Sequence, residues 1–591
     1  MGCESTSFSK YCISAGHVIA QGLAKALKPV MPSGMKHFLL LLLPAVTWAT
    51  PAYDLMLYNG NIYTGDEKRP KAEVVMVRNG RITYVGTNVE ANRLPAGPQR
   101  AIDLHGATVV PGLNDAHLHL AGIGFRELNF DLEGTSGVAE LKEKLRARMA
   151  REGAKKWIVG RGWIETHWSP AEFPTARELD EVSPDNPVAL TRSDGHALVA
   201  NSLALKLARI DRSTPDPTGG KILRYPDSGE ATGMLIDEAQ SLVERLLPAP
   251  TAAEVEHALI VGAQREASLG WTAVQIAGHS YEEAELVRRL VKEGKIKLRI
   301  YDAVSAPGAD ADQLMAHGPV LGESNGRYTR RGVKLYIDGA LGSRGAALLA
   351  PYADSPNNTG LLMKREDELR PFLKDALQRG IQVQTHAIGD RGNRMMLDLY
   401  EKAFAAVPVK ERRVAEPRWR IEHAQIIDPV DIPRFGRLGV IASMQPSHAI
   451  GDLYFAPKRL GPARLAGAYA WQSLLQSGAV IAVGSDAPVE RGEPMIEFYA
   501  AVARRSPEGF ANEDWHLEQR MTRAQALRAM TVSAAFAAFE ENERGTIAAG
   551  QWADFTVLSA DIMQIPETEI LQTKCLMTIV GGEVVYEAIK H

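Results

Sequence analysis

Residues 108–119 read Thr-Val-Val-Pro-Gly-Leu-Asn-Asp-Ala-His-Leu-His, and this stretch decides how the chain folds. It begins with β-branched residues, which favour a strand, and it ends in a His-x-His pair. Alternate residues of a strand point to the same face, so His117 and His119 can reach one metal ion. A His-x-His pair is weak evidence by itself, and its meaning depends on the rest of the chain.

Seven further strand-like segments follow, and helical stretches separate them. This alternation is expected of parallel βα units, and eight such units close a barrel. The sequence therefore predicts an α/β fold with a (β/α)8 TIM-like barrel, which we place with its insertion at residues 107–544. After residues 108–119 the expected strands are residues 272–276, 297–303, 333–338, 381–386, 418–424, 440–445 and 480–486.

The interval of about 120–270 between the first two strands is too long for one loop of a compact domain. It contains strand-like segments such as Trp157-Ile-Val-Gly and Asn186-Pro-Val-Ala-Leu-Thr. We therefore expect an inserted subdomain there. Short β-like pieces broken by Asn-Gly turns also occupy residues 51–106 and return at 545–591. Each end alone would leave exposed strand edges, so we expect both to pair in one small β-sandwich.

Residues 1–50 have the pattern of an N-terminal extension and a secretory signal. Met35-Lys-His is followed by an apolar run from Phe38 to Leu43 and by small residues near Ala49. We expect translation to start at Met35 and the protein to be exported, either periplasmic or secreted. A buried helix or an uncleaved anchor is the alternative. N-terminal sequencing of the exported protein tests this, because a chain that starts before Met35 contradicts it.

The formal net charge of −4 is small for 591 residues, and no basic run is present. These features argue against nucleic-acid binding and leave a small-molecule substrate as the expected partner. We expect no membrane association after signal removal, and a homodimer is allowed. The three cysteines, Cys3, Cys12 and Cys575, cannot form a zinc-finger pattern or a disulfide framework. Any metal site must therefore use histidine, carboxylate or a modified side chain.

Three more candidate ligands lie where barrel strands end. His386 ends the fifth predicted strand, His423 lies near the end of the sixth, and Asp486 ends the eighth. Barrel enzymes build their active sites at the C-terminal ends of the strands. Each residue also has a structural explanation: His386 as a core histidine, His423 paired with Glu422, and Asp486 as a helix cap. All three explanations would have to hold together, which favours a metal site.

The ordered pattern resembles the amidohydrolase superfamily, specifically the amidohydrolase family 3 branch that contains N-substituted formamide deformylase. The resemblance runs from Tyr53 to about Tyr586 and rests on long phrases besides the His-x-His pair. They are Arg192-Ser-Asp-Gly-His-Ala, Asn201-Ser-Leu-Ala-Leu, Gly332-Val-Lys-Leu-Tyr-Ile-Asp-Gly-Ala-Leu-Gly-Ser-Arg and Gly545-Thr-Ile-Ala-Ala-Gly-Gln-Trp-Ala-Asp-Phe.

The resemblance implies a divalent metal site with one or two zinc ions. Lys334 would carry CO₂ as a carbamate, an anionic ligand with two oxygens that can bridge two ions. The alternative is a lysine paired with Asp338 or one that reaches the surface. The implied ligands are His117, His119 and Asp486 for one ion, His386 and His423 for the other, and Lys334 between them.

The implied reaction is hydrolysis of a non-peptide C–N bond, amide-like or formamide-like, by metal-activated hydroxide. Asp486 would be the catalytic base and then the acid that protonates the leaving amine. His196, in the insertion, and Arg344, after the fourth strand, are candidate substrate contacts, each with a local bond or salt bridge as the alternative. A carbamate, lactam or cyclic imide hydrolase is the nearest rival. A non-catalytic exported binding protein on the same fold is the second.

Overall fold

The computed structural model describes residues 53–588, apart from 95–96, 154, 166–167, 193–194, 196, 218–219, 512 and 514. The chain divides into Met1–Thr50 and a second unit, Pro51–His591. The expected signal sequence and the start at Met35 lie outside the described residues, as does His196. Within the described part, no helix combines the length and apolar character needed to cross a membrane.

The central sheet contains eight parallel strands, in the order β22-β21-β20-β19-β18-β16-β15-β8, and a short ninth strand, β17 (Val320–Gly322), pairs antiparallel with β18. Each of the eight segments expected from the sequence contributes one of these strands, and the predicted (β/α)8 TIM-like fold is confirmed. The strands are β8 (Leu113–Leu118), β15 (Trp271–His279), β16 (Arg299–Ser305), β18 (Tyr328–Tyr336), β19 (Gln382–Ala387), β20 (Arg420–His423), β21 (Ile441–Met444) and β22 (Ile481–Val483).

Backbone hydrogen bonds join the first strand of the barrel to the segment that follows the last. Asp486 N–H donates to the His117 carbonyl at 2.7 Å, and His119 N–H donates to the Ala487 carbonyl at 2.8 Å. Gly484 permits this approach, because a Cβ there would lie 2.4 Å from the His117 nitrogen. The ends of the sheet are therefore brought together at the carboxyl edge of the strands.

Helices pack on the outside of the barrel strands around one large apolar core. α8 illustrates the local sequence rules: Thr251 and Glu254 form a capping box at its start, and Gly270, with φ of 108°, ends it. The helices of this unit include α3 (Leu120–Leu128), α8 (Ala252–Leu269), α9 (Tyr281–Lys292), α10 (Ala309–His317), α12 (Glu366–Arg379), α13 (Asp390–Ala406), α14 (Ile432–Leu438), α15 (Pro446–Asp452), α17 (Trp471–Gln476) and α18 (Pro494–Ala503).

Both ends of the described chain contribute to two small sheets that share an apolar core. One sheet has the order β5-β4-β1-β6, and the other has the order β25-β24-β23-β7-β2-β3. Their strands are β1 (Tyr53–Tyr58), β2 (Asn61–Tyr63), β3 (Lys71–Ala72), β4 (Val74–Arg78), β5 (Arg81–Gly86), β6 (Pro98–Asp103), β7 (Thr108–Pro111), β23 (Phe555–Leu558), β24 (Cys575–Val580) and β25 (Glu583–Glu587).

The stretch 108–119, expected to be a single strand, is two strands in different sheets. β7 pairs with β2 and β23 in the small sheet, whereas β8 belongs to the barrel. Gly112 separates them where the backbone passes close to β15: a Cβ there would lie 2.3 Å from the Thr272 hydroxyl oxygen. The chain therefore enters the barrel after Gly112 and not at residue 107.

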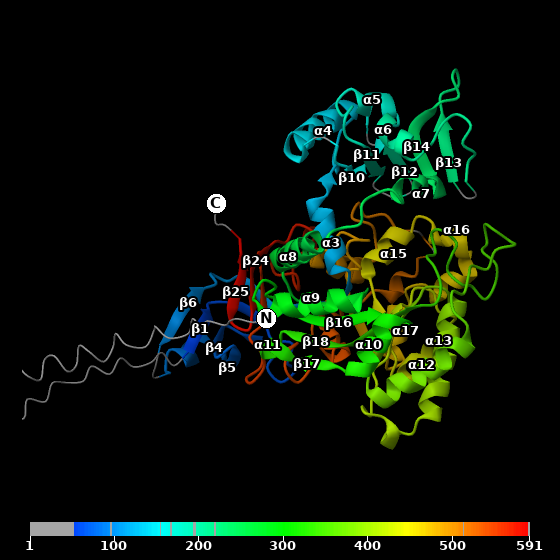
Figure 1. Cartoon of the computed structure of the whole chain (residues 1–591). Helices are drawn as coiled ribbons and strands as arrows, with labels where there is room; N and C mark the ends of the chain where they lie inside the picture. The colour runs from blue at the N-terminus through cyan, green and yellow to red at the C-terminus, as the bar shows by residue number, and fades with distance from the viewer. Residues whose placement is uncertain are drawn as a thin grey trace, which may run out of the picture. The chain divides into compact units, whose positions relative to one another are not determined.

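The long interval after β8 contains its own six-stranded sheet, with the order β13-β14-β12-β11-β10-β9 (Figure 1). Apolar clusters that include Trp163 and Leu235 pack with α4 (Val138–Glu152), α5 (Ala176–Asp180), α6 (Ser202–Leu207) and α7 (Ser241–Glu244). The strands are β9 (Phe130–Asp131), β10 (Ile158–Trp163), β11 (Val188–Arg192), β12 (Ala197–Ala200), β13 (Gly220–Arg224) and β14 (Ala231–Asp237).

Arg299 on β16 and Asp554 next to β23 form a buried ion pair between the barrel and the small sheets. Arg299 Nε lies 2.6 Å from Asp554 Oδ2, and the two side chains are 3% and 5% exposed. Asp554 also accepts a hydrogen bond from Gly581 N–H at 2.8 Å. Burial would raise the pKa of Asp554, but Arg299 holds it below its ordinary value.

We expect Arg299→Met to lower the free energy of unfolding by about 3–5 kcal/mol, because Asp554 would remain buried and charged without a partner. The exposed pair of Arg370 and Glu366 provides the control, and Arg370→Met should cost about 0.5 kcal/mol or less. Asp554 has a depressed pKa, so its stabilisation is present above about pH 4 and is lost as the pH falls further. Urea unfolding at several pH values measures both effects. Equal losses in the two variants at neutral pH would contradict this assignment.

Candidate metal centre

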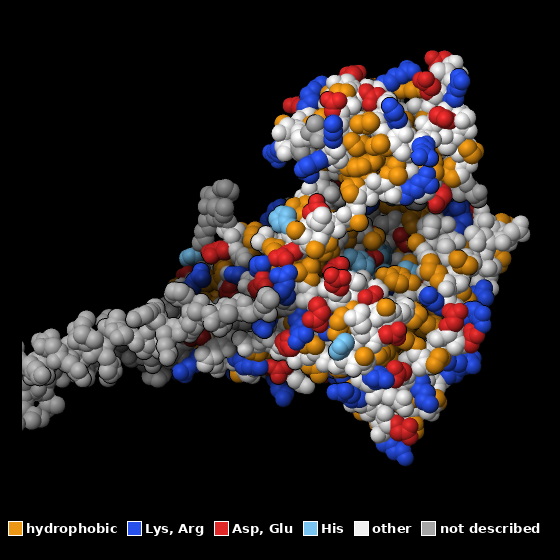
Figure 2. Space-filling model, viewed as in Figure 1, with side chains coloured by type: hydrophobic (Ala, Val, Ile, Leu, Met, Phe, Trp, Pro, Cys, Tyr) orange, Lys and Arg blue, Asp and Glu red, His pale blue; other side chains and the backbone are white. Residues whose placement is uncertain are grey.

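The six sequence-predicted ligands lie at the carboxyl ends of the barrel strands. His117 is on β8, Lys334 on β18, His386 on β19 and His423 on β20. His119 precedes α3, and Asp486 follows β22. Figure 2 shows histidine side chains, in pale blue, gathered at the bottom of a hollow in the surface.

His117 is fully buried and is oriented by a carboxylate. Its Nδ1 lies 2.5 Å from Glu422 Oε2, and neither side chain is exposed. Burial would raise the pKa of Glu422, but His117 beside it holds that pKa below its ordinary value. Nδ1 therefore carries the hydrogen, and the lone pair of Nε2 is free to bind a metal. The alternative pairing of Glu422 with His423 is not what the structure shows.

His117, His423 and Asp486 form a compact cluster of possible ligands. One ligand atom from each lies within 4.8 Å of the others, and all three residues are buried. His423 Nδ1 lies 2.8 Å from Gln445 Oε1, an oxygen that can only accept, so Nε2 of His423 also has a free lone pair. His423 and Asp486 have φ values of 73° and 58°, a left-handed backbone that costs energy outside glycine and often occurs at functional sites.

Asp486 is ionised at neutral pH. Burial would raise its pKa, but the hydrogen bond from His119 and the nearby His117 hold the pKa well below its usual value. His119 Nε2 lies 3.2 Å from Asp486 Oδ1, and the His119 side chain is 31% exposed. Asp486 therefore presents an anionic carboxylate between a buried histidine and a partly exposed one. It does not cap a helix directly, because α18 begins only at Pro494.

His386 completes the group of imidazoles. Its ring centroid lies 4.6 Å from that of His423, with the planes at 70°. Burial and then the charge of Lys334 lower the pKa of His386 to about 3, so the ring is neutral and able to bind a cation. Its Nε2 has no hydrogen-bond partner among the described residues and lies 3.5 Å from Asp338 Oδ1.

Lys334 is buried among these groups and does not reach the surface. Its Nζ lies 3.1 Å from His117 Nε2. Burial lowers the pKa of Lys334, although Glu422 and Asp486 oppose that change. The alternative partner Asp338 is otherwise engaged, because it accepts backbone hydrogen bonds from Ala347, Ile388 and Gly389.

This set of donors fits a divalent metal. It combines the imidazoles of His117 and His423, each oriented through its Nδ1, with an ionised carboxylate, which is the ligand chemistry of zinc sites. Within the part of the chain that the structure describes, several buried polar atoms around it lack a hydrogen-bond partner, among them Glu422 Oε1 and His386 Nε2. A bound cation would recover part of the cost of burying such groups.

The two candidate substrate contacts are not brought to this centre by any described interaction. Arg344 forms two hydrogen bonds of 3.0 Å with Asp354, which is the salt bridge weighed against substrate binding. His196 lies outside the described residues. Sequence reasoning missed His448, which is buried 3.6 Å from Asp486 Oδ2. The phrase Gln445-Pro-Ser-His448 directly follows the seventh strand, and that position was the available signal.

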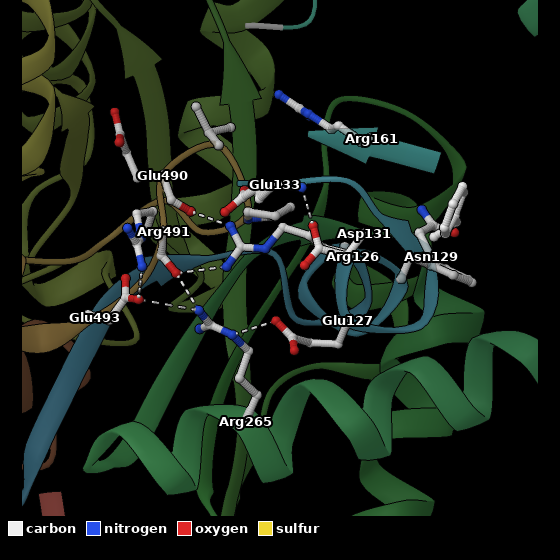
Figure 3. A pocket seen from close by; sticks show the side chains of 15 residues that line it. Arg126, Glu127, Asn129, Asp131, Glu133, Arg161, Arg265, Glu490, Arg491 and Glu493 are labelled. Carbon is white, nitrogen blue, oxygen red and sulfur yellow. Dashed lines mark hydrogen bonds and ion pairs between the residues drawn. The ribbon is translucent and has the colours of Figure 1, made fainter. Parts of the chain in front are cut away.

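The loop that begins at Asp486 is anchored by two arginines (Figure 3). Arg126 on α3 donates to the carbonyls of Glu490 and Arg491 at 2.9 and 2.8 Å, and Arg265 on α8 donates to Arg491 at 2.8 Å. These side chains line a cavity of about 390 Å³ that Arg161 of the insertion also borders. The backbone after Asp486 is therefore fixed to the barrel helices.

Comparison with known proteins agrees with this geometry. The model of the amidohydrolase family matches residues 100–586. The chain is 36% identical to the protein LONG AFTER FAR-RED 3 of Arabidopsis thaliana, over 90% of this chain and 91% of that protein. It is 29% identical to the N-substituted formamide deformylase of Arthrobacter pascens, over 91% of this chain and 99% of that protein. A solved uncharacterised metal-dependent hydrolase from Pyrococcus horikoshii superposes with a TM-score of 0.68 at 27% identity, covering 87% of this chain and 99% of that one.

We expect Glu422→Gln to weaken metal binding about 10–100-fold, because the carboxylate that orients His117 is lost. Metal content after dialysis against a graded chelator measures the change. Glu283→Gln is the matched control, since Glu283 lies 3.0 Å from a different histidine, His279. Unchanged metal affinity in a folded Glu422→Gln protein would contradict the role given to this pair.

Proposed function

The chain belongs to the amidohydrolase family, and from this premise we propose that it hydrolyses a non-peptide C–N bond of the amide or formamide type. The observation that carries the proposal is the buried group of His117, His423 and Asp486, whose ligand atoms lie within 4.8 Å of one another. Its oriented imidazoles and ionised carboxylate suit a metal-dependent hydrolase. The similarity to a formamide deformylase supports the finer substrate class.

When bound, a divalent metal, zinc by ligand type, would supply a water of lowered pKa and polarise the substrate carbonyl. Asp486 would accept a proton from the attacking water as the water oxygen bonds to the acyl carbon. It then gives the proton to the departing nitrogen as the C–N bond breaks, so it is general base and then general acid. Because its pKa is held well below the ordinary value, Asp486 is unprotonated before the reaction, and its protonated form readily gives the proton to the leaving nitrogen.

Lys334 is proposed to carry CO₂ as a carbamate. The lowered pKa of Lys334 increases the fraction of the side chain that is present as the neutral amine, and the lone pair of that amine can attack CO₂. An N–C bond forms, one proton leaves the nitrogen, and the product is an anion with two oxygens that suits metal ions. The 3.1 Å separation of Nζ from His117 Nε2 supports this position between the histidines.

The same reaction centre could act on carbamates, lactams or cyclic imides, because the pocket and not the metal selects among them. A non-catalytic binding protein is the rival from another class. The ionised Asp486, held beside His119, argues against it, because simple binding does not need such a base.

Asp486→Asn should lower kcat/KM for an N-substituted formamide such as N-benzylformamide about 10²–10⁴-fold, the size of a lost general base. Asp428→Asn, in a partly exposed ion pair with Arg394, is the control and should keep full activity. Amide, carbamate, lactam and cyclic imide substrates are assayed in parallel to find the bond that is cleaved. A wild-type protein that is fully loaded with metal and cleaves none of them would contradict the proposal.

Lys334→Met should lower the metal content from about two ions per chain to one or none, because the bridging ligand cannot form. Elemental analysis of protein prepared without a metal-affinity tag, with and without bicarbonate, measures the content. Lys297→Met, which alters a half-exposed pair with Glu583, is the control. Two ions in the Lys334→Met variant would rule out the carbamate as a required ligand.

A further inference from the structure

His448 is a buried histidine at the mouth of the barrel that the proposed mechanism does not use. It belongs to α15, directly after β21, and is 8% exposed. Its ring stacks on that of His423, with centroids 5.7 Å apart and planes at 23°. His448 is therefore fixed against one predicted metal ligand and beside another, Asp486.

Two observations place a hydrogen on Nε2 of His448. Its Nδ1 lies 2.9 Å from Gln425 Nε2, an amide nitrogen that can only donate, so Nδ1 accepts. Its Nε2 lies 3.6 Å from Asp486 Oδ2 and 3.9 Å from Glu490 Oε1. Because two carboxylates lie on the Nε2 side of the ring, a hydrogen on Nε2 is favoured over an unprotonated nitrogen whose lone pair would face them.

That N–H has no hydrogen-bond partner among the described residues. Both carboxylate oxygens are beyond hydrogen-bond distance, and Nε2 of His448 is a buried polar atom without a partner. In Figure 3 the Glu490 carboxylate points away from Arg126 and Arg265, and the Glu490 side chain is 32% exposed. Buried donors are almost always satisfied, so an unsatisfied one beside a catalytic carboxylate indicates a missing acceptor.

We propose that His448 donates its Nε2–H to the acyl oxygen of the substrate amide. The inference rests on the proposed amide hydrolysis and adds a residue that contacts the substrate. As water adds to the acyl carbon, the C=O π electrons move onto the oxygen, and the N–H···O hydrogen bond strengthens with its negative charge. His448 keeps its proton throughout. Asp486 alone carries the proton from the water to the leaving nitrogen.

Two substitutions at one position test the donor. His448→Leu removes it and should lower kcat for N-benzylformamide about 10²–10³-fold with little change in KM, as for loss of an oxyanion donor. His448→Gln keeps an N–H donor, so its kcat should be at least tenfold higher than that of His448→Leu. Metal content should stay at the wild-type value in both. His317→Leu, at an exposed histidine of α10, is the control.

Equal kcat values for the Leu and Gln variants would overturn the proposal, as would loss of metal in His448→Leu, which would make His448 a ligand. Acetate binding to the metal-loaded protein, followed by calorimetry, separates this inference from the proposed function. If the wild type cleaves no amide, the proposed function fails. Acetate binding that is weaker in the Leu variant and restored in the Gln variant would still support the donor, and equal binding in all three proteins would overturn it.

Discussion

Closure of the barrel is the constraint on which the candidate site depends. The backbone hydrogen bond from Asp486 to His117 and that from His119 to Ala487 join the first strand to the segment after the last. Buried Asp115 reinforces this join, because one of its oxygens accepts from both His117 N–H and Ser485 N–H at 3.0 Å. The residues that close the barrel also carry predicted ligand side chains. Metal binding and closure therefore stabilise each other, since a preformed site exists only in the closed fold.

Burial sets the charges of the site. It lowers the pKa of His386 to about 3, so this imidazole is neutral, and it also lowers the pKa of Lys334. The same burial would neutralise carboxylates, but Asp486 and Glu422 remain ionised because histidines lie against them. The protein accepts several unsatisfied buried atoms here, and such local cost is typical of positions selected for chemistry over stability.

Apolar strand patterns predicted the barrel well, because each barrel strand is a short run of mostly buried residues. The prediction of a single strand over residues 108–119 was wrong because Thr108-Val-Val and the His-x-His pair both have a strand-like sequence. Only the pairing of β7 and β8 with strands of different sheets separates the two. Glu422 and His423 both face His117 because the positive φ of His423 breaks the alternation of a strand. His448 lies beyond its strand, where residue spacing predicts no direction. The ligand roles remain predictions from sequence that the geometry accommodates.

The small sheets built from both chain ends have a consequence for the order of synthesis. Asn61 donates a hydrogen bond to Asp561, a residue 500 positions later. On the ribosome, β2 and β7 emerge hundreds of residues before β23, the strand that pairs with β7. Until then an apolar strand edge has no partner, and such edges promote aggregation. β23 therefore completes a sheet in which β2, β3 and β7 are translated much earlier, and a chain that terminates before residue 555 leaves β7 paired with β2 alone.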